Sequence, residues 1–183
     1  MFKHTAHHGQ NVHHLKQVIG TQTLTFEEMS TLLYQIEACL NSRPLSQLSV
    51  NSQDPTPLTP GHFLVGEPLV LVPDSNYETS SVSSLKRWQL TQQLLQHFWR
   101  RWSNEYLTQF MQRYKWAHQK PEPNVGDIVL VREDNLPPAK WLLGIITDKH
   151  AGSDNITRVV SLKCKDVIVK RPITKLCVLP VTK

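Results

Sequence analysis

The sequence has few cysteines and no long apolar run, and each shortage excludes a class of protein. Its three cysteines (Cys39, Cys164 and Cys177) form no C-x-x-C pair. This argues against a disulfide framework and against a structural zinc site, and it suits a reducing compartment. The longest apolar run, residues 141–146, is far shorter than the roughly 18 residues of a membrane helix. The first residues are polar and rich in histidine, unlike a secretory signal. We therefore expect an intracellular protein, nuclear or cytoplasmic, that is not secreted and has no membrane partner.

The sequence also lacks the usual marks of an enzyme. Its seven glycines are scattered, so no glycine-rich loop is available to cradle a phosphate. The three cysteines and nine histidines show no spacing that is typical of a nucleophile and its base. We expect no catalytic residue, no cofactor and no small-molecule substrate.

Five histidines crowd the beginning of the chain. Metal binding is one interpretation, because imidazole is the commonest metal ligand. Their spacing fits no recognised metal site, and no cysteine or carboxylate lies among them. We therefore predict no metal site and favour a polar, frayed terminus over residues 1–20. The five are His4, His7, His8, His13 and His14.

Positive charge is scarce in the first half of the chain and abundant in the second. Residues 1–84 hold three lysines and arginines against seven aspartates and glutamates, a net charge of −4. Residues 85–183 hold seventeen against eight, a net charge of +9. A basic half of this kind is typical of a module that faces nucleic acid. A soluble surface with extra lysines explains the charge equally well.

Two helices are expected in the first half. Thr25 and Glu28 have the spacing of a capping box, apolar residues recur every three or four positions up to residue 41, and Pro44 ends the pattern. A short helix follows from an N-cap at Thr59 to about Gly66. The predicted core stripe of the first helix is Met29, Leu32, Leu33, Ile36 and Leu40.

The middle of the chain alternates between strand-like, polar and helical patterns. Residues 67–73 are the only strand-like run of the first half, and residues 74–84 are a polar linker. Residues 84–117 then predict a long helix that Ser84 can cap. Its predicted apolar stripe is Leu85, Trp88, Leu95, Trp99, Trp102, Tyr106 and Phe110, widened by Leu94, Phe98, Leu107 and Met111. Its tryptophans alternate with arginines and could stack on bases, but we favour core packing for the tryptophans and leave both interpretations open for the cations.

The remainder predicts five short strands joined by tight turns, with a 3₁₀ turn over residues 172–175 before the last strand. So many short antiparallel strands in so short a stretch favour a small closed barrel, because closure removes exposed edges. We expect an α+β fold. The expected strands are residues 125–133, 139–150, 155–164, 166–171 and 176–180.

Four segments carry a resemblance to retroelement integrases. "VGDIVLVREDNLPPAKWLLGIITDKH" resembles the SH3-like barrel at the end of these proteins, and "LTPGHFLVGEPL" resembles the segment that closes their catalytic core. Together with "LTFEEMSTLLYQIEACLNSRPL" and "RWQLTQQLLQHFWRRWSNEYL", their order is most similar to that of Pao (BEL-type) retrotransposon polyproteins. The resemblance extends over nearly the whole chain from Lys16 onward.

The resemblance implies an organisation in successive segments. N-terminal helices would be the truncated tail of an RNase H-like catalytic core, followed by a linker, a basic amphipathic helix and a five-stranded SH3-like β-barrel. The last two together would form the domain of unknown function that follows the core. The boundaries are 1–73 for the core tail, 74–84 for the linker, 85–118 for the helix, 124–181 for the barrel and 85–181 for the helix and barrel together.

The resemblance does not bring catalysis. In the family's core, two Asp and one Glu hold divalent metal ions. The metal ions activate the attacking group and stabilise the leaving oxygen, and they need clustered carboxylates to bind. Glu27, Glu28 and Glu37 match none of these positions. The start of the chain also departs from the family, where one unbroken helix descends from the catalytic Glu, because residues 5–11 interrupt it here.

The expected function is therefore non-catalytic nucleic-acid binding in DNA integration. Lysines and arginines of the helix and barrel would grip the phosphate backbone, which gives affinity without sequence reading. The alternatives are a protein interaction or self-association module, including contact with an integrase core, and a decayed element remnant without function. The candidate residues are Arg100, Arg101, Arg132, Lys140, Lys149, Arg158, Lys163, Lys170 and Arg171.

Overall fold

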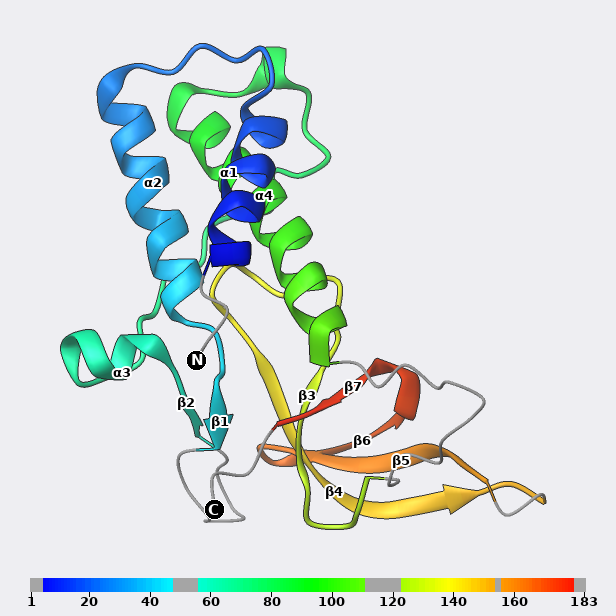
Figure 1. The fold of residues 1–183 in the computed structure, drawn as a ribbon. Coiled ribbons are helices and arrows are strands. Elements are labelled where there is room, and N and C mark those ends of the chain that lie inside the picture. Colours follow the sequence, from blue (N-terminus) through cyan, green and yellow to red (C-terminus); the bar gives the residue numbers. More distant parts are fainter. Residues whose placement is uncertain (1–4, 48–55, 111–122, 154–155, 180–183) are drawn as a thin grey trace.

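The computed structural model describes residues 5–47, 56–110, 123–153 and 156–179. Figure 1 shows a layer of helices above a twisted five-stranded sheet, with the long fourth helix reaching from one to the other. The fold is α+β, as the sequence predicts. The helices are α1 (Thr5–Ile19), α2 (Phe26–Asn41), α3 (Pro60–Val65) and α4 (Arg87–Phe110), and the strands of the large sheet are β3 (Ile128–Val131), β4 (Leu142–Ala151), β5 (Thr157–Cys164), β6 (Val167–Pro172) and β7 (Leu176–Val178).

Helix α2 begins at the predicted capping box. The Thr25 hydroxyl accepts a hydrogen bond from the Glu28 amide, and the Glu28 carboxylate accepts one from the Thr25 amide. Two amides that the helix start would leave unpaired are thereby satisfied. Arg87 of α4 pairs with the same carboxylate, and these bonds lower the pKa of Glu28. Leu32 and Ile36 of the predicted stripe are buried, and they pack against α4, but Leu33 of the same predicted stripe is exposed, so its burial was predicted wrongly.

Helix α1 contradicts both the frayed terminus predicted for residues 1–20 and the interruption predicted for residues 5–11, because residues 5–11 are part of one continuous helix. Leu15 and Ile19 pack against the core formed with α4. The Nε2 atom of the buried His14 lies 2.5 Å from Oε2 of Glu105, which is on α4. Both predictions are wrong because intrinsic helix propensity is weak here, and packing on α4 overrides it.

Helix α3 begins and ends where the sequence predicts. Pro60 occupies the first turn after Thr59, where its missing N–H costs nothing. Gly66 closes the helix at a φ of 80°, a left-handed conformation that glycine adopts without a Cβ penalty.

The strand predicted for residues 67–73 is wrong. These residues run as a loop without strand pairing, and Val70 and Val72 are exposed. Alternating valines fit a strand only where a neighbouring strand pairs with them. The small sheet of the first half instead pairs β1 (Ser46–Gln47) with β2 (Pro57–Leu58).

Helix α4 begins at Arg87, later than the predicted cap at Ser84, which instead ends a 3₁₀ turn over Val82–Ser84. Trp88 is exposed, although the pattern placed it in the core stripe. The predicted residues 111–117 lie outside the described part of the chain. The buried residues of α4 that the pattern placed in its apolar stripe are Leu94, Leu95, Phe98, Trp99, Trp102, Tyr106 and Leu107.

The large sheet has the strand order β6-β5-β4-β3-β7, and all neighbours are antiparallel. The predicted 3₁₀ turn is present as Ile173–Lys175 and connects β6 to β7 at opposite ends of this order. Leu176 of β7 nevertheless shares one core cluster with Val160 and Leu162 of β5. The sheet therefore curls around one core as the predicted small barrel, but it is not closed by strand pairing, because the described residues of β6 and β7 are not paired with each other.

The two faces of this sheet have different surroundings. The inner face carries the barrel core around Val160 and Leu162. On the outer face, Leu107 of α4 packs with Ile128, Ile145 and Cys177. The cluster beneath α4 holds described residues of β3, β4 and β7 and none of β5 or β6, so α4 covers only half of the outer face.

Candidate nucleic-acid interface

The nine candidate cations lie in separate places rather than in one patch. Two are on α4, two are in the connection between β3 and β4, two are on the outer face of β5 and β6, and three are elsewhere on the β4–β5–β6 strands. In that order they are Arg100 and Arg101, Arg132 and Lys140, Lys163 and Lys170, and Lys149, Arg158 and Arg171.

The two arginines of α4 are engaged within the fold. Arg100 Nη1 lies 3.3 Å from Glu78 Oε2 in the segment before the helix. Arg101 donates a hydrogen bond to the Gln17 side chain of α1. Both contacts stabilise the helical layer, and a phosphate would have to compete with them.

Arg132 also serves the fold. Its Nε donates to Asn104 Oδ1 of α4 over 3.1 Å, so it links the end of β3 to the helix. Lys140 is exposed and lies after the Pro137–Pro138 connection. Neither residue lies on the β5–β6 half of the sheet.

Lys163 and Lys170 share the uncovered half of the outer face. The register pairs Lys163 with Ile145 and Ile168, and it pairs Ser161 with Asp148 and Lys170. Directly paired residues of antiparallel strands project to the same face. The two lysines are therefore diagonal neighbours on adjacent strands.

Sequence reasoning missed the polar residues beside these lysines. His150 is on the same face, because it pairs with Val159, two residues from Ser161. Its Nε2 lies 2.8 Å from Ser161 Oγ, and its Nδ1 lies 3.9 Å from Asp148 Oδ2. Side chains of a strand alternate between its two faces, so counting along the strands from Lys163 would place these residues on its face. The count fails without knowledge of the bulges between β4 and β5, which the sequence does not show.

Lys149 and Arg171 project to the opposite face. Both pair with Val160, the buried residue at the centre of β5. Arg171 Nη2 donates to Glu133 Oε2 over 3.1 Å. The register between β4 and β5 shifts at Arg158, so the directly paired residues of these two strands do not include it.

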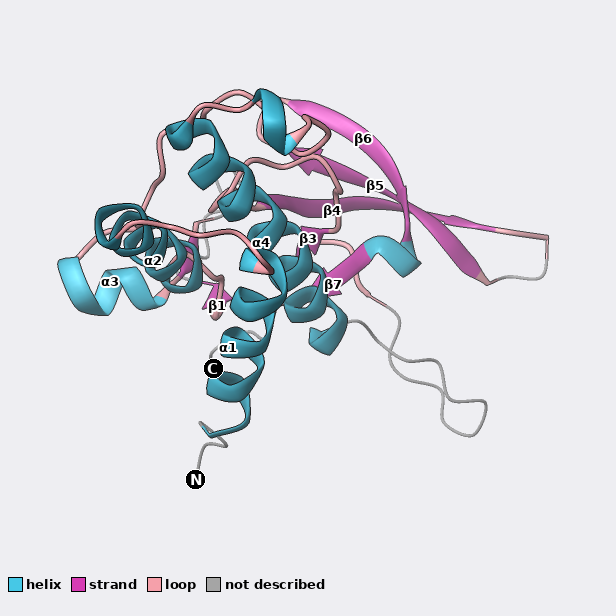
Figure 2. Ribbon diagram, turned by 90° about the horizontal axis from the view of Figure 1, so that it is seen from above, coloured by secondary structure: helices cyan, strands magenta, loops and turns pink. Residues whose placement is uncertain are grey.

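The β4–β5 hairpin extends well beyond the rest of the barrel (Figures 1 and 2). Lys149 lies on one face of these strands and Lys163 on the other. No side-chain partner of Lys149, Lys163 or Lys170 is found within the described residues. Lys163 and Lys170 lie where β6 pairs with β5 rather than on the projecting part of the hairpin, so they can neutralise phosphates of a duplex that lies against the outer face of the sheet.

The large aromatic residues near the sheet do not offer stacking platforms. Trp99 and Trp102 are 4% and 7% exposed, which agrees with the preferred core interpretation. Trp141 packs edge-on against Trp99 at a centroid distance of 4.9 Å, and its Nε1 donates to Ser42 Oγ over 3.2 Å. Base stacking through these rings would require the core to open.

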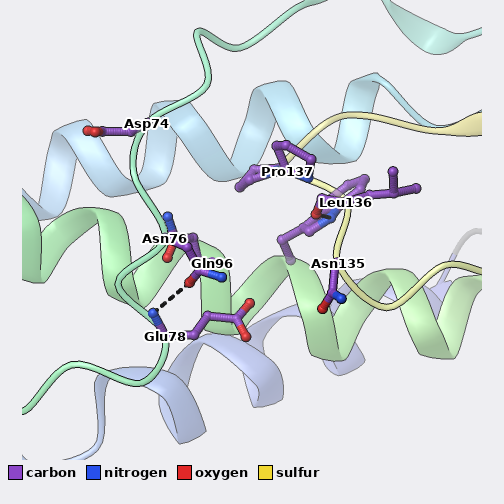
Figure 3. Close-up of a pocket in the computed structure, with 9 residues that line it drawn as sticks. Asp74, Asn76, Glu78, Gln96, Asn135, Leu136 and Pro137 are labelled. Carbon is purple, nitrogen blue, oxygen red and sulfur yellow. Dashed lines mark hydrogen bonds between the residues drawn. The ribbon is translucent and has the colours of Figure 1, made fainter.

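A small pocket lies between the segment before α4 and the connection from β3 to β4. Figure 3 shows Asp74, Asn76 and Glu78 on one side of it and Asn135 with Pro137 on the other. Its carboxylates repel phosphate. The pocket therefore does not extend the cationic surface.

Within the described residues, no three His, Cys, Asp or Glu side chains gather closely enough to hold a metal ion. Among the same residues, no helix is both long and apolar enough to cross a bilayer. The side chains of His4, His7 and His8 lie outside what the structure describes.

Helix α4 and the curled sheet define the class of this chain: an α+β module in which one long helix covers half the outer face of a small antiparallel barrel. The chain belongs to a family of unknown function, DUF5641, whose model matches residues 86–179. No curated protein and no solved structure matches it.

Proposed function

We propose that the chain is a non-catalytic nucleic-acid-binding part of a retrotransposon integrase of the Pao (BEL) type, acting in DNA integration. The order of the four integrase-like segments supports the origin. The lysines on the outer face of β5 and β6, Lys163 and Lys170, together with Lys149 on the opposite face, carry the binding proposal.

The expected ligand is the backbone of duplex DNA. The major groove of B-DNA admits a two-stranded β-ribbon, and the extended hairpin has this form (Figure 2). The lysines would contact phosphates, which position a protein without reading sequence. The burial of Trp99 and Trp102 disfavours single strands, whose binding depends on exposed aromatic platforms.

The proposal is tested by titrating labelled duplexes of two unrelated sequences at several salt concentrations. Three phosphate contacts predict a slope of log affinity against log salt of about −3, equal for both duplexes. Lys163→Ala/Lys170→Ala should weaken binding at low salt and reduce the magnitude of the slope by about 2.

The matched control is Lys16→Ala/Lys86→Ala, which removes the same charge from exposed positions of the helical layer. It should leave the slope unchanged if the hairpin region is the interface. Absence of binding at low salt, or an equal loss in both double variants, contradicts the proposal.

A further inference from the structure

One side of the helical layer exposes large apolar residues, and we call it the acidic apolar surface. It is formed by exposed apolar residues of α2 and of α3, and these two helices contact each other at the edge of the molecule (Figures 1 and 2). Its apolar residues are Phe26, Leu33, Tyr34, Phe63, Leu64 and Val65.

This surface is more apolar than the solvent face of a helix normally is. Phe26 and Leu33 are 82% and 44% exposed and lie seven residues apart, on one stripe of α2. Phe63 is 72% exposed, and the two residues after it on α3 are exposed as well. Exposed apolar groups that gather in this way mark interaction sites.

The charge around this surface narrows the choice of partner. Exposed carboxylates flank it at Glu27, Glu37 and Glu67. Two arginines lie at the ends of α2, and both are engaged within the fold: Arg43 donates to the Leu40 carbonyl over 2.6 Å, and Arg87 pairs with Glu28. A partner must therefore bring apolar side chains together with positive charge.

The chain carries such a surface on its other half, which we call the basic apolar edge. Ile168 of β6 is 67% exposed and directly pairs with Lys163, while Lys170 follows on the same face. These three residues lie on the half of the outer face that α4 leaves open. Asp148 shares the face but is a single carboxylate beside two lysines.

We propose that two copies of this chain associate head to tail, the acidic apolar surface of one copy binding the basic apolar edge of the next. A symmetric contact between the acidic apolar surfaces of two copies is disfavoured, because their carboxylates would repel each other. Charge favours the head-to-tail contact, because the exposed carboxylates of Glu27, Glu37 and Glu67 on one surface would meet the ammonium groups of Lys163 and Lys170 on the other. A contact of this kind leaves a free surface at each end, so further copies add on.

The test is sedimentation velocity of the purified chain without nucleic acid, at increasing protein concentration and at roughly 50 mM and roughly 500 mM salt. The weight-average mass should rise with concentration beyond that of a dimer and rise less at high salt. Leu33→Ser/Phe63→Ser and Ile168→Ser should each remain monomeric when measured alone.

Mixing the two variants separates this geometry from every symmetric one. Each variant retains the surface that the other has lost, so an equimolar mixture should form a dimer and nothing larger. Val72→Ser and Val167→Ser are matched controls, because both residues are exposed but lie outside the two surfaces; they should associate like the parent chain. Far-UV circular dichroism and melting temperature verify that every variant is folded.

A parent chain that stays monomeric at low salt overturns the proposal. So does a mixture that stays monomeric, or an association that Ile168→Ser leaves intact. Failure here is distinct from failure of nucleic-acid binding, since Ile168→Ser removes no cation and the experiment contains no DNA.

Discussion

At the scale of single residues, the junction between helices and sheet buries groups that ionise only at high pH. Tyr106 donates its hydroxyl to the Pro44 carbonyl over 2.5 Å, and burial raises its pKa to about 12. Burial also raises the pKa of Cys39 to about 12 and that of Cys177 to about 11. All three side chains are therefore neutral in the folded chain well above their ordinary pKa values.

These groups predict a loss of stability at alkaline pH. The unfolded chain releases the thiol and phenol protons first, so their contribution is complete below about pH 9 and is lost as pH rises toward 12. The free energy of unfolding in urea should fall by more than about 2 kcal/mol between about pH 8 and about pH 11. Cys39→Ala should start less stable and lose less over this interval. Parallel curves for the parent and Cys39→Ala would show that the thiol does not contribute.

Some residue contacts follow from sequence and others do not. The burial of Trp99 and Trp102 was predictable, because helical spacing alone places them on an apolar stripe. The hydrogen bond from Trp141 to Ser42 joins residues 99 positions apart, and no local pattern encodes such a partner. The candidate cations were identified by type, but their division between two faces depends on strand register and on bulges.

At the scale of elements, predictions succeeded where the signal was local. The capping box of α2 and the proline and glycine around α3 act within a few residues, so the sequence displays them. Helix α1 and residues 67–73 were predicted wrongly, since a helix of weak propensity depends on packing and a strand depends on its neighbour.

Strand β4 contains one position, Gly144, where any larger side chain would force its neighbours to shift. A Cβ on Gly144 would lie 2.9 Å from Cys164 Sγ and 3.3 Å from Leu162 Cβ. Gly144→Ala should therefore cost about 1–3 kcal/mol of unfolding free energy, measured in urea. Cys164→Ala removes the closer atom, so the double variant should lose less than the sum of the single losses. If the two single losses of unfolding free energy simply add in the double variant, the cost of Gly144→Ala arises from the backbone and not from contact with Cys164.

At the scale of the whole molecule, α4 belongs to both layers. From Leu90 to Tyr106 it contributes to the core shared with α1 and α2, and Leu107 packs on the sheet. Trp141 closes the junction, with its ring centroid 6.0 Å from that of Trp102 and 5.5 Å from that of Tyr106. The helices and the sheet should consequently unfold in one transition.

Trp141→Ala tests this coupling. It should lower the free energy of unfolding by about 3 kcal/mol, and hydrogen exchange should accelerate in both α2 and β4. Trp88→Ala is the matched control, because Trp88 is half exposed and its loss should cost less than about 1 kcal/mol. Faster exchange confined to the sheet would mean that the two layers unfold independently.

Helix α2 and its packing partner α4 are far apart in the sequence, and this separation has a consequence during protein synthesis. Leu32 and Ile36 leave the ribosome well before Phe98 and Trp99, the α4 residues of their shared core. At the usual pace of translation this delay lasts on the order of several seconds. During that time the apolar stripes of α1 and α2 have no cover. Chaperones should therefore engage the nascent chain between the completion of α2 and the emergence of α4, and release it once α4 has docked.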